Sequence, residues 1–481
     1  MSEIKSPTGE VYYPVIGLEI HAELNTASKM FSSSKNDPDE VLPNIHINPV
    51  DVGHPGTLPT INKKAVEHMV KIGLSVNGTI ANFTEFDRKN YFYPDIPKGY
   101  QISQYKYPIV SGGTLAGVDI TRIHLEEDTG LSKHDRGDFS LVDFNRAGVP
   151  LMELVTEPVI TSSSEATEFA RELQLLLRYL GVAEANMEKG EMRVEANISV
   201  SKQKGVFGTK VEVKNLNSFK SVEKAIEFEL DRMISLYEAG LQDQIVQETR
   251  GWDEVKQKTF SQRKKETSDD YRYFPEPDLP KLYLHELFDL EKIKAELPET
   301  PAQMRVRFSE IYNLPQKDVE IFIQNKNLAL FFEEVAQHIS DMSVLQKASN
   351  FILSDMVYIL DTQAGSVLPQ VKTFVALLTL FTSDQITSRG AKDMLLISMT
   401  TMHDIDPLKY ATDNGLIQKN NTDEIIPIVQ KIIDNHPDIV AEYKSGKETV
   451  LQFFVGQIMK ETKGSANPKM SMDILKELLN K

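Results

Sequence analysis

The sequence contains no cysteine among its 481 residues. This absence excludes disulfide bonds and thiolate metal sites, so any bound metal must use oxygen or imidazole ligands. No apolar run approaches the roughly 18 residues that span a bilayer, and the N-terminal residues 1–8 lack the apolar core of a signal peptide. We therefore expect a cytoplasmic protein that makes no membrane contact.

An excess of basic residues is also missing, since the formal net charge is −17. This balance argues against a broad phosphate-binding surface but leaves room for a nucleic acid held at a local basic patch or through bound cations. The chain lacks a Walker motif and a Gly-x-Gly-x-x-Gly motif, which disfavours an ordinary phosphate-loop or dinucleotide fold. A Ser/His/Asp arrangement with a recognisable local context is absent as well.

The length predicts more than one domain. Residues 1–295 mix alternating, strand-like runs with helical segments, whereas residues 296–410 follow a helical pattern and residues 411–481 resemble a small helical module. The chain is therefore expected to have an α+β fold in which a mixed or antiparallel sheet precedes helices. Strands are predicted over residues 15–24, 118–127, 149–156, 192–200 and 208–214. Helices are predicted after the capping-box spacing Ser162-x-x-Glu165 and from about Val222 to Ala239.

The run 15–24 alternates with the period of a strand. Apolar residues fall on one face, and Glu19, His21 and Glu23 fall on the other. A lone strand of this kind is often only half-buried with a solvated polar face. Three other strands repeat the pattern, however, and this repetition favours a shared site. Their polar residues are Arg122, His124 and Glu126 with Glu127 and Asp128 at the strand end, Glu153, and Arg193, Glu195, Asn197 and Ser199.

Glu153 is the most informative acid, because it interrupts an apolar run. An ionised carboxylate there is costly unless it is paired or bound to a metal. Carboxylates with an imidazole and no thiol suit Mg²⁺ or Mn²⁺ better than zinc. Separate solvated faces or ion pairs would produce the same pattern, so the sequence physics leaves both interpretations open.

Two loops combine basic, aromatic and Pro/Gly residues. They are residues 86–104, which contain Lys89 and Lys98, and residues 268–278. Lysines in such a loop can bind phosphate oxygens as point charges. A rigid surface loop anchored by aromatic rings would have the same composition.

These segments together resemble the B subunits of the tRNA-dependent aspartyl/glutamyl-tRNA(Asn/Gln) amidotransferases, and the resemblance extends from the first strand to the C-terminal tail. The motifs that carry it are Val15-Ile-Gly-Leu-Glu-Ile-His21, Phe86-Asp-Arg-Lys-Asn-Tyr-Phe-Tyr-Pro-Asp95, His124-Leu-Glu-Glu-Asp128, Ser140-Leu-Val-Asp-Phe-Asn-Arg146, Lys214-Asn-Leu-Asn-Ser-Phe219, Asp270-Tyr-Arg-Tyr-Phe-Pro-Glu-Pro-Asp278, Phe454-Val-Gly-Gln-Ile-Met-Lys460 and Lys463-Gly-Ser-Ala-Asn-Pro468.

The resemblance implies a cradle-like catalytic domain over 1–295, a helical domain over 296–410 and a YqeY-like tRNA-binding tail over 411–481. It implies that ATP phosphorylates the side-chain carboxylate of Glu-tRNA(Gln) or Asp-tRNA(Asn). Ammonia, released from glutamine by an amidase-type A subunit, then displaces the phosphate, and a small C subunit completes a heterotrimer. No glutaminase signature occurs in this chain, which agrees with a separate ammonia-producing partner.

The family's site residues are carried over by motif. His21, Glu127 and Glu153 would hold Mg²⁺, with Glu19 and Glu126 near enough to hold a second cation. Glu127 would also act in catalysis, together with Lys89 and Lys98, which would contact phosphate or the activated acyl group. Asn217 and Ser218 would join Lys89 and Lys98 in binding ATP, and Lys460, Lys463 and Lys469 would contact tRNA.

Many relatives carry a cysteine zinc site where this chain has Ser32, Ser34, Asn48 and Asp51, so no structural zinc is expected. Two other functions remain compatible with the residues alone. One is a stand-alone Mg²⁺-dependent phosphohydrolase or nuclease, and the other is a non-catalytic tRNA-binding scaffold whose acidic strands are structural.

Overall fold

The computed structural model describes residues 3–133, 137–264, 271–401, 404–418, 422–462 and 466–480. It divides into two compact units, Met1–Pro301 and Ala302–Lys481. A mixed sheet with helices in the first unit and helices alone in the second confirm the predicted α+β class. The three domain limits 1–295, 296–410 and 411–481 stay a prediction.

The first unit is built on an 11-stranded sheet with the order β16-β15-β14-β13-β2-β12-β9-β7-β3, in which β1 pairs with β2 and β8 with β9. The pairings are antiparallel except that of β14 with β15. Small sheets are formed by β10 with β11, β4 with β18, and β5 with β6 and β17. The strands are β1 Ile4–Lys5, β2 Val11–Glu23, β3 Thr79–Ile80, β4 Phe83–Thr84, β5 Asp87–Asn90, β6 Tyr100–Ser103, β7 Val110–Ser111, β8 Thr114–Leu115, β9 Val118–Glu127, β10 Leu131–Lys133, β11 Leu141–Asp143, β12 Pro150–Thr156, β13 Met192–Ser201, β14 Val211–Leu216, β15 Glu248–Asp253, β16 Lys258–Lys264, β17 Phe274–Pro275 and β18 Leu282–Tyr283.

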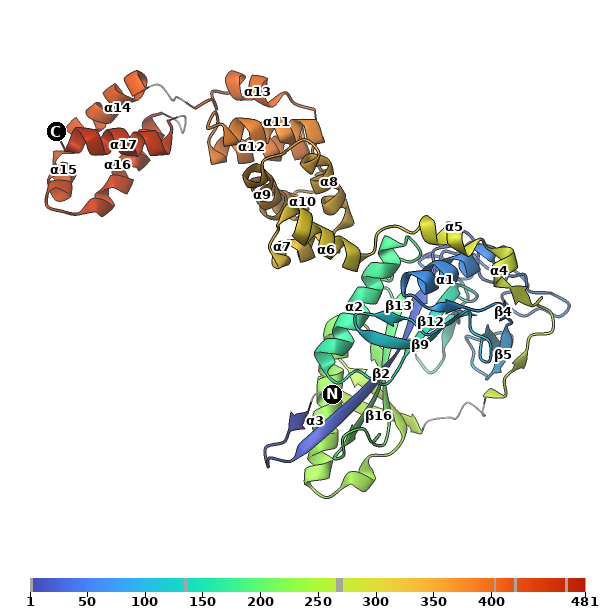
Figure 1. Ribbon diagram of the computed structural model, residues 1–481. Coiled ribbons are helices and arrows are strands. Elements are labelled where there is room, and N and C mark those ends of the chain that lie inside the picture. The colour runs from blue at the N-terminus through green and yellow to red at the C-terminus, as the bar shows by residue number, and fades with distance from the viewer. Residues whose placement is uncertain are drawn as a thin grey trace. The chain divides into compact units, whose positions relative to one another are not determined.

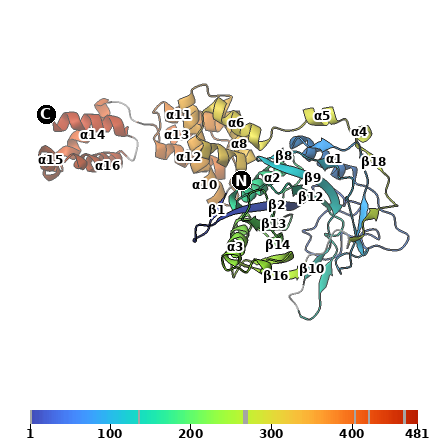
Figure 2. The same ribbon diagram turned by 60° about the horizontal axis from the view of Figure 1, so that its bottom comes forward.

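Helices cover the apolar face of the large sheet. Figure 1 shows α2 and α3 alongside the strands, and Figure 2, turned by 60°, shows α3 next to β13 and β14. The even-numbered residues of β2 from Ile16 to Ala22 are buried in one continuous core with the apolar faces of α1, α2 and α3. The opposite, polar face of these strands is thereby left for the site. The helices of this unit are α1 Lys63–Ser75, α2 Ser163–Tyr179, α3 Phe219–Glu238, α4 Leu284–Leu287 and α5 Leu290–Ala295, with a 3₁₀ turn at Gln242–Gln244.

The two long helices begin at serine caps. The Ser162 hydroxyl accepts a hydrogen bond from the Glu165 backbone N–H at 3.2 Å, as its spacing predicted. The helix expected from about Val222 begins earlier, at Phe219. The reason is that Ser218 caps it by accepting from the Ser221 N–H at 3.0 Å.

The second unit consists of helices packed through aromatic and aliphatic side chains. Buried Phe308, Phe322 and Phe332 contact one another with ring centroids 4.8–5.8 Å apart. A separate apolar cluster around Phe454 and Ile458 joins α14, α16 and α17. The helices are α6 Pro301–Tyr312, α7 Gln316–Gln324, α8 Lys326–Ala336, α9 Met342–Asn350, a π-helical turn Phe351–Met356, α10 Val357–Thr362, α11 Val371–Thr382, α12 Ser388–Thr400, α13 Pro407–Asp413, α14 Thr422–Asp434, α15 Pro437–Lys444, a 3₁₀ turn Glu448–Val450, α16 Leu451–Glu461 and α17 Pro468–Leu479. Within the described ranges, no helix has the length and apolar character needed to cross a membrane.

Candidate active site

Strand register brings the predicted polar residues together on the face away from the helices. His21 on β2 pairs with Arg193 on β13 and with Glu153 on β12, and Glu153 pairs in turn with His124 on β9. Directly opposed residues on neighbouring antiparallel strands hold their Cβ atoms about 4.5–5.5 Å apart. The register therefore converts four separated segments of the sequence into one row of side chains across the sheet.

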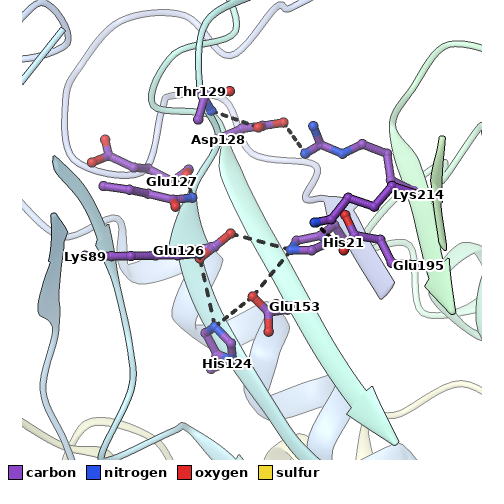
Figure 3. A network of polar contacts seen from close by, with 12 residues as sticks. His21, Lys89, His124, Glu126, Glu127, Asp128, Thr129, Glu153, Glu195 and Lys214 are labelled. Carbon is purple, nitrogen blue, oxygen red and sulfur yellow. Dashed lines mark hydrogen bonds and ion pairs between the residues drawn. The ribbon is translucent and has the colours of Figure 1, made fainter. Parts of the chain in front are cut away.

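Glu153 lies at the centre of this row (Figure 3), between the two imidazoles. One of its carboxylate oxygens is 3.3 Å from Nε2 of His21 and 3.3 Å from Nε2 of His124. Glu126 adds a second carboxylate, 3.8 Å from His21 Nε2. Arg122 lies 3.7 Å from the other oxygen of Glu153. The acid that sequence reasoning singled out is thus paired on both sides, as the cost of burying a lone carboxylate requires.

The proximity of opposite charges shifts the pKa values of this row. Burial lowers the pKa of His21, but the hydrogen bond and charge of Glu153, with the charge of Glu126, outweigh it and raise this pKa to about 9. Burial raises the pKa of Glu153, but His124 and His21 outweigh it and hold this pKa well below its usual range. In the absence of a metal, the protonated imidazole of His21 therefore balances the charge of Glu153, and a bound cation would take over this role once His21 had lost its proton.

A second group of carboxylates lies beside the first. Glu19, Glu195 and Glu212 can bring one oxygen each within 4.8 Å of one another. Burial, with the charges of Glu153 and Glu195, raises the pKa of Glu19 to about 7. Lys214 lies 2.7 Å from Glu195 and supplies a cation to this group. Glu212 and Lys214 were missed by the sequence reasoning, although their alternation within 211–214 was a usable signal.

Both groups open into one polar cavity of about 500 Å³. Five lysines and arginines line it together with six acids and four tyrosines. Lys89 extends over this cavity with its Nζ 4.0 Å from Glu126. Burial lowers the pKa of Lys89, but the charge of Glu126 outweighs it and holds this pKa well above its usual range. The lining residues are Glu19, His21, Lys89, Tyr91, Gln101, Gln104, Tyr105, Arg122, His124, Glu126, Asp128, Thr129, Leu151, Glu153, Arg193, Glu195, Lys210, Glu212, Lys214, Thr249, Tyr271 and Tyr273.

Glu127 occupies a different place from the other predicted ligands. It follows Glu126 on β9 and therefore points to the other face, where both of its oxygens bind Lys98 Nζ at 2.5 and 2.6 Å. The pair lines a small cavity of about 10 Å³ that shares Gln101, Asp128 and Thr129 with the large one. Among the described residues, the metal-ligand groups that include His21 or Glu153 do not include Glu127. Glu127 as a metal ligand stays a prediction.

The lining of this cavity does not include Asn217, Ser218, Lys460 or Lys469. Ser218 caps α3 and Asn217 is exposed beside it, so the ATP-binding role of both stays a prediction. Lys460 on α16 and Lys469 on α17 are exposed. Lys463 lies outside the described residues.

The carboxylate oxygens of this site suit a hard divalent cation that also accepts an imidazole nitrogen as a ligand. Glu153 belongs to two candidate ligand groups of three residues each. The first contains Glu19 and His21, and the second contains His124 and Glu126. In each group the ligand atoms lie within 4.8 Å of one another. Glu126 Oε2 is buried and accepts no hydrogen bond from the residues that the structure describes. Carboxylates with one imidazole match Mg²⁺ or Mn²⁺. His124 was placed on the polar face by its sequence but was not among the predicted ligands.

Hydrogen bonds organise the loop that contains Ser32, Ser34, Asn48 and Asp51. Asp51 accepts from the Ser34 hydroxyl at 2.6 Å and from the Asn48 N–H at 2.9 Å, and Ser34 N–H donates to Ser32 at 3.3 Å. Fully buried Lys29 lies 3.7 Å from Asp51 and donates to the Phe144 carbonyl at 3.1 Å. Ser32, Ser34, Asn48 and Asp51 thus form a polar cluster around one buried ion pair.

Replacing Lys29 with methionine is expected to lower the free energy of unfolding by about 3 kcal/mol, because it leaves the Asp51 carboxylate buried without its cation. Urea denaturation would measure the loss, and the double variant K29M/D51N should recover part of it. Lys35→Met, at the exposed pair with Asp37, is the matched control and should leave the urea midpoint nearly unchanged. Equal stability of Lys29→Met and the wild type would contradict this role of the pair.

Fold and site together define a catalytic domain with a charged cavity on a mixed sheet, followed by a helical unit. Residues 14–288 match the family model of the GatB/GatE catalytic domain, and residues 330–479 match that of the GatB domain. These two matches cover the cavity and most of the helices.

Full-length relatives narrow the class to one family. The chain is 41% identical to the B subunit of the aspartyl/glutamyl-tRNA(Asn/Gln) amidotransferase of a Synechococcus species, over 99% of each chain. It is 43% identical to the protein of the same name from Thermoanaerobacter pseudethanolicus, over 98% of this chain and 100% of the relative. It is 42% identical to the protein of the same name from Thermotoga petrophila, over 97% of this chain and 99% of the relative. The chain belongs to the family of aspartyl/glutamyl-tRNA(Asn/Gln) amidotransferase B subunits.

Proposed function

We propose that this chain is the B subunit of a heterotrimeric tRNA-dependent amidotransferase that converts Glu-tRNA(Gln), Asp-tRNA(Asn) or both to the amidated forms. The observation that carries the proposal is the row His21, Glu153 and His124 beside Lys89 in one charged cavity. An amidase-type A subunit would supply ammonia, and a small C subunit would complete the complex.

The proposed chemistry has two steps. An oxygen of the substrate's side-chain carboxylate attacks the γ-phosphorus of ATP, ADP leaves, and an acyl phosphate forms. Ammonia then attacks the acyl carbon, the C–O bond to phosphate breaks, and the nitrogen loses a proton. The products are the amide, inorganic phosphate and that proton. Both steps bring anions together, so positioned cations lower the barrier more than a protein nucleophile would.

The residues of the cavity suit these roles. Lys89, Arg122 and Arg193 line it as cations that can contact phosphate or carboxylate oxygens. His21, His124, Glu19, Glu126 and Glu153 would hold one or two Mg²⁺ ions, which supply charge neutralisation at the phosphates when bound. Lys98, held by Glu127 next to the cavity, would contact the activated acyl group.

Reconstitution tests the proposal. The chain is purified with its A and C partners and given Glu-tRNA(Gln), ATP, Mg²⁺ and glutamine, and Gln-tRNA(Gln) is measured. Ammonium chloride in place of glutamine should also support the reaction, because the amidation step does not need glutaminase activity. ATP hydrolysis without amide would contradict the proposal and favour a phosphohydrolase.

We also propose that the C-terminal helices contact tRNA through exposed Lys460 and Lys469. A variant that ends at Gln418 keeps α13 and the bridge between Ile386 and Ile417. This variant is expected to need about tenfold more tRNA for half-maximal rate, since lost phosphate contacts weaken binding without touching the cavity. Titration of Glu-tRNA(Gln) measures the shift, and an unchanged requirement would contradict the contact.

A further inference from the structure

A continuous row of five tyrosine rings runs along the rim of the cavity. Tyr93 contacts Tyr91 with centroids 6.1 Å apart, and Tyr91 contacts Tyr271 at 5.8 Å. Tyr273 lies 6.1 Å from Tyr271 and stacks on Tyr105 at 4.4 Å and an interplanar angle of 9°. We refer to these five residues as the tyrosine row. Four of its members, all but Tyr93, line the cavity that contains Glu153.

The row joins the two aromatic loops of the sequence. β17 pairs with β5, and β5 pairs with β6, so Tyr271 and Tyr273 are placed against the ends of the other two strands. Asn90 Nδ2 donates to the carbonyls of Tyr271 at 3.2 Å and Arg272 at 2.9 Å. Arg88 binds both oxygens of buried Glu276 at 2.6 and 2.8 Å. These contacts hold the rings in place before any ligand arrives.

Two rings of the tyrosine row are about half exposed to solvent, although these contacts fix their positions. Tyr93 is 54% exposed and Tyr105 is 51% exposed. A cation lies beside the row: Lys89 Nζ is 5.4 Å from the Tyr271 ring and 6.0 Å from the Tyr91 ring. Half-exposed aromatic rings with adjacent cations are the features by which proteins bind unpaired nucleotides, because every base can stack and every phosphate carries a charge.

We propose that the tyrosine row binds the unpaired 3′ nucleotides of the aminoacyl-tRNA and guides its amino acid to Glu153. This inference rests on the proposed function, in which the reacting carboxylate is attached to that 3′ end. The negative charge of the chain, −17, also favours a short stacking contact over a wide basic surface. The adenine of ATP has the same ring chemistry and is the competing occupant.

The test compares two uncharged tRNAs, one complete and one lacking its unpaired 3′ nucleotides, as ligands of the whole complex. The wild type is expected to bind the complete tRNA about tenfold more tightly. The double variant Y105L/Y273L should reduce this ratio to near one, whereas Y105F/Y273F should retain it because phenylalanine still stacks. Tyr283→Leu, which removes an exposed tyrosine that contacts Phe83 instead, is the matched control and should keep the full ratio.

A second measurement needs no variant. Emission from 2-aminopurine placed at the terminal base should fall when the tRNA binds the wild type, and unchanged emission would overturn the proposal. An equal affinity of the wild type for both tRNAs would overturn it too, as would leucine variants that weaken ATP binding alone. Binding is measured without turnover, so a failure of amide formation would contradict the proposed function and not the 3′-end contact.

Discussion

Replacing Glu153 with glutamine is expected to slow amide formation by about 10³-fold. Glutamine keeps the shape of the side chain but removes the charge that both imidazoles face at 3.3 Å. It also removes a carboxylate that belongs to two of the candidate cation groups. The rate of Gln-tRNA(Gln) formation with ammonium chloride measures the first effect, and Mn²⁺ affinity followed by electron paramagnetic resonance measures the second.

Two controls separate this effect from misfolding or loss of the partner. The complex that contains Glu153→Gln should still release ammonia from glutamine, since that chemistry belongs to the A subunit. Glu157→Gln, just past the end of β12 and bonded to Thr121 at 2.7 Å, should keep near wild-type rates. Wild-type amide formation by the Glu153 variant would contradict the assignment of the cluster to catalysis.

Replacing Lys98 with methionine is expected to slow the reaction by about 10²-fold, because a positioned cation would be lost next to the reacting acyl group. The loss also leaves Glu127 without its partner at 2.5 Å. The steady-state rate of the variant, measured at saturating ATP and tRNA, reports the size of the effect.

The double variant K98M/E127Q separates the two possible causes. If Lys98 only neutralises Glu127, removing both charges should restore much of the rate, whereas a direct contact with substrate leaves the double variant as slow as Lys98→Met. We expect the second result. Lys281→Met, which removes an exposed lysine at 3.6 Å from Glu85, is the control and should have no effect.

The two-residue period of a strand predicts to which face of the sheet Glu126 and Glu127 point. Strand period assigned Glu126 to the face of His124, and the structure places it there, 3.9 Å away. The same alternation turns Glu127 to the opposite side of the strand, where it binds Lys98. The role of Glu127 as a metal ligand, which the family motif gave, stays a prediction.

The two aromatic loops form one structure that the composition of either loop alone does not predict. Each had the composition of a nucleotide- or phosphate-binding loop and also that of a rigid surface loop. The pairing of β17 with β5 unites them into one wall of the cavity. The sequence of one loop does not predict that it pairs with the other, because the paired residues are separated by 186 and 188 positions in the chain.

The sequence by itself determined the α+β class, the apolar and polar faces of the main strands, the serine cap of α2, the absence of thiolate chemistry and the family. These features depend on residue type and on periods of two or 3.6, which act over a few neighbours. Only the tertiary structure decided that Arg193, His21, Glu153 and His124 form one row. Only the tertiary structure likewise decided that Lys214 lies beside Glu195 and that the five tyrosines form a row. Strand register arises from long-range pairing and burial, and a shift of one residue would turn Glu153 toward the helices.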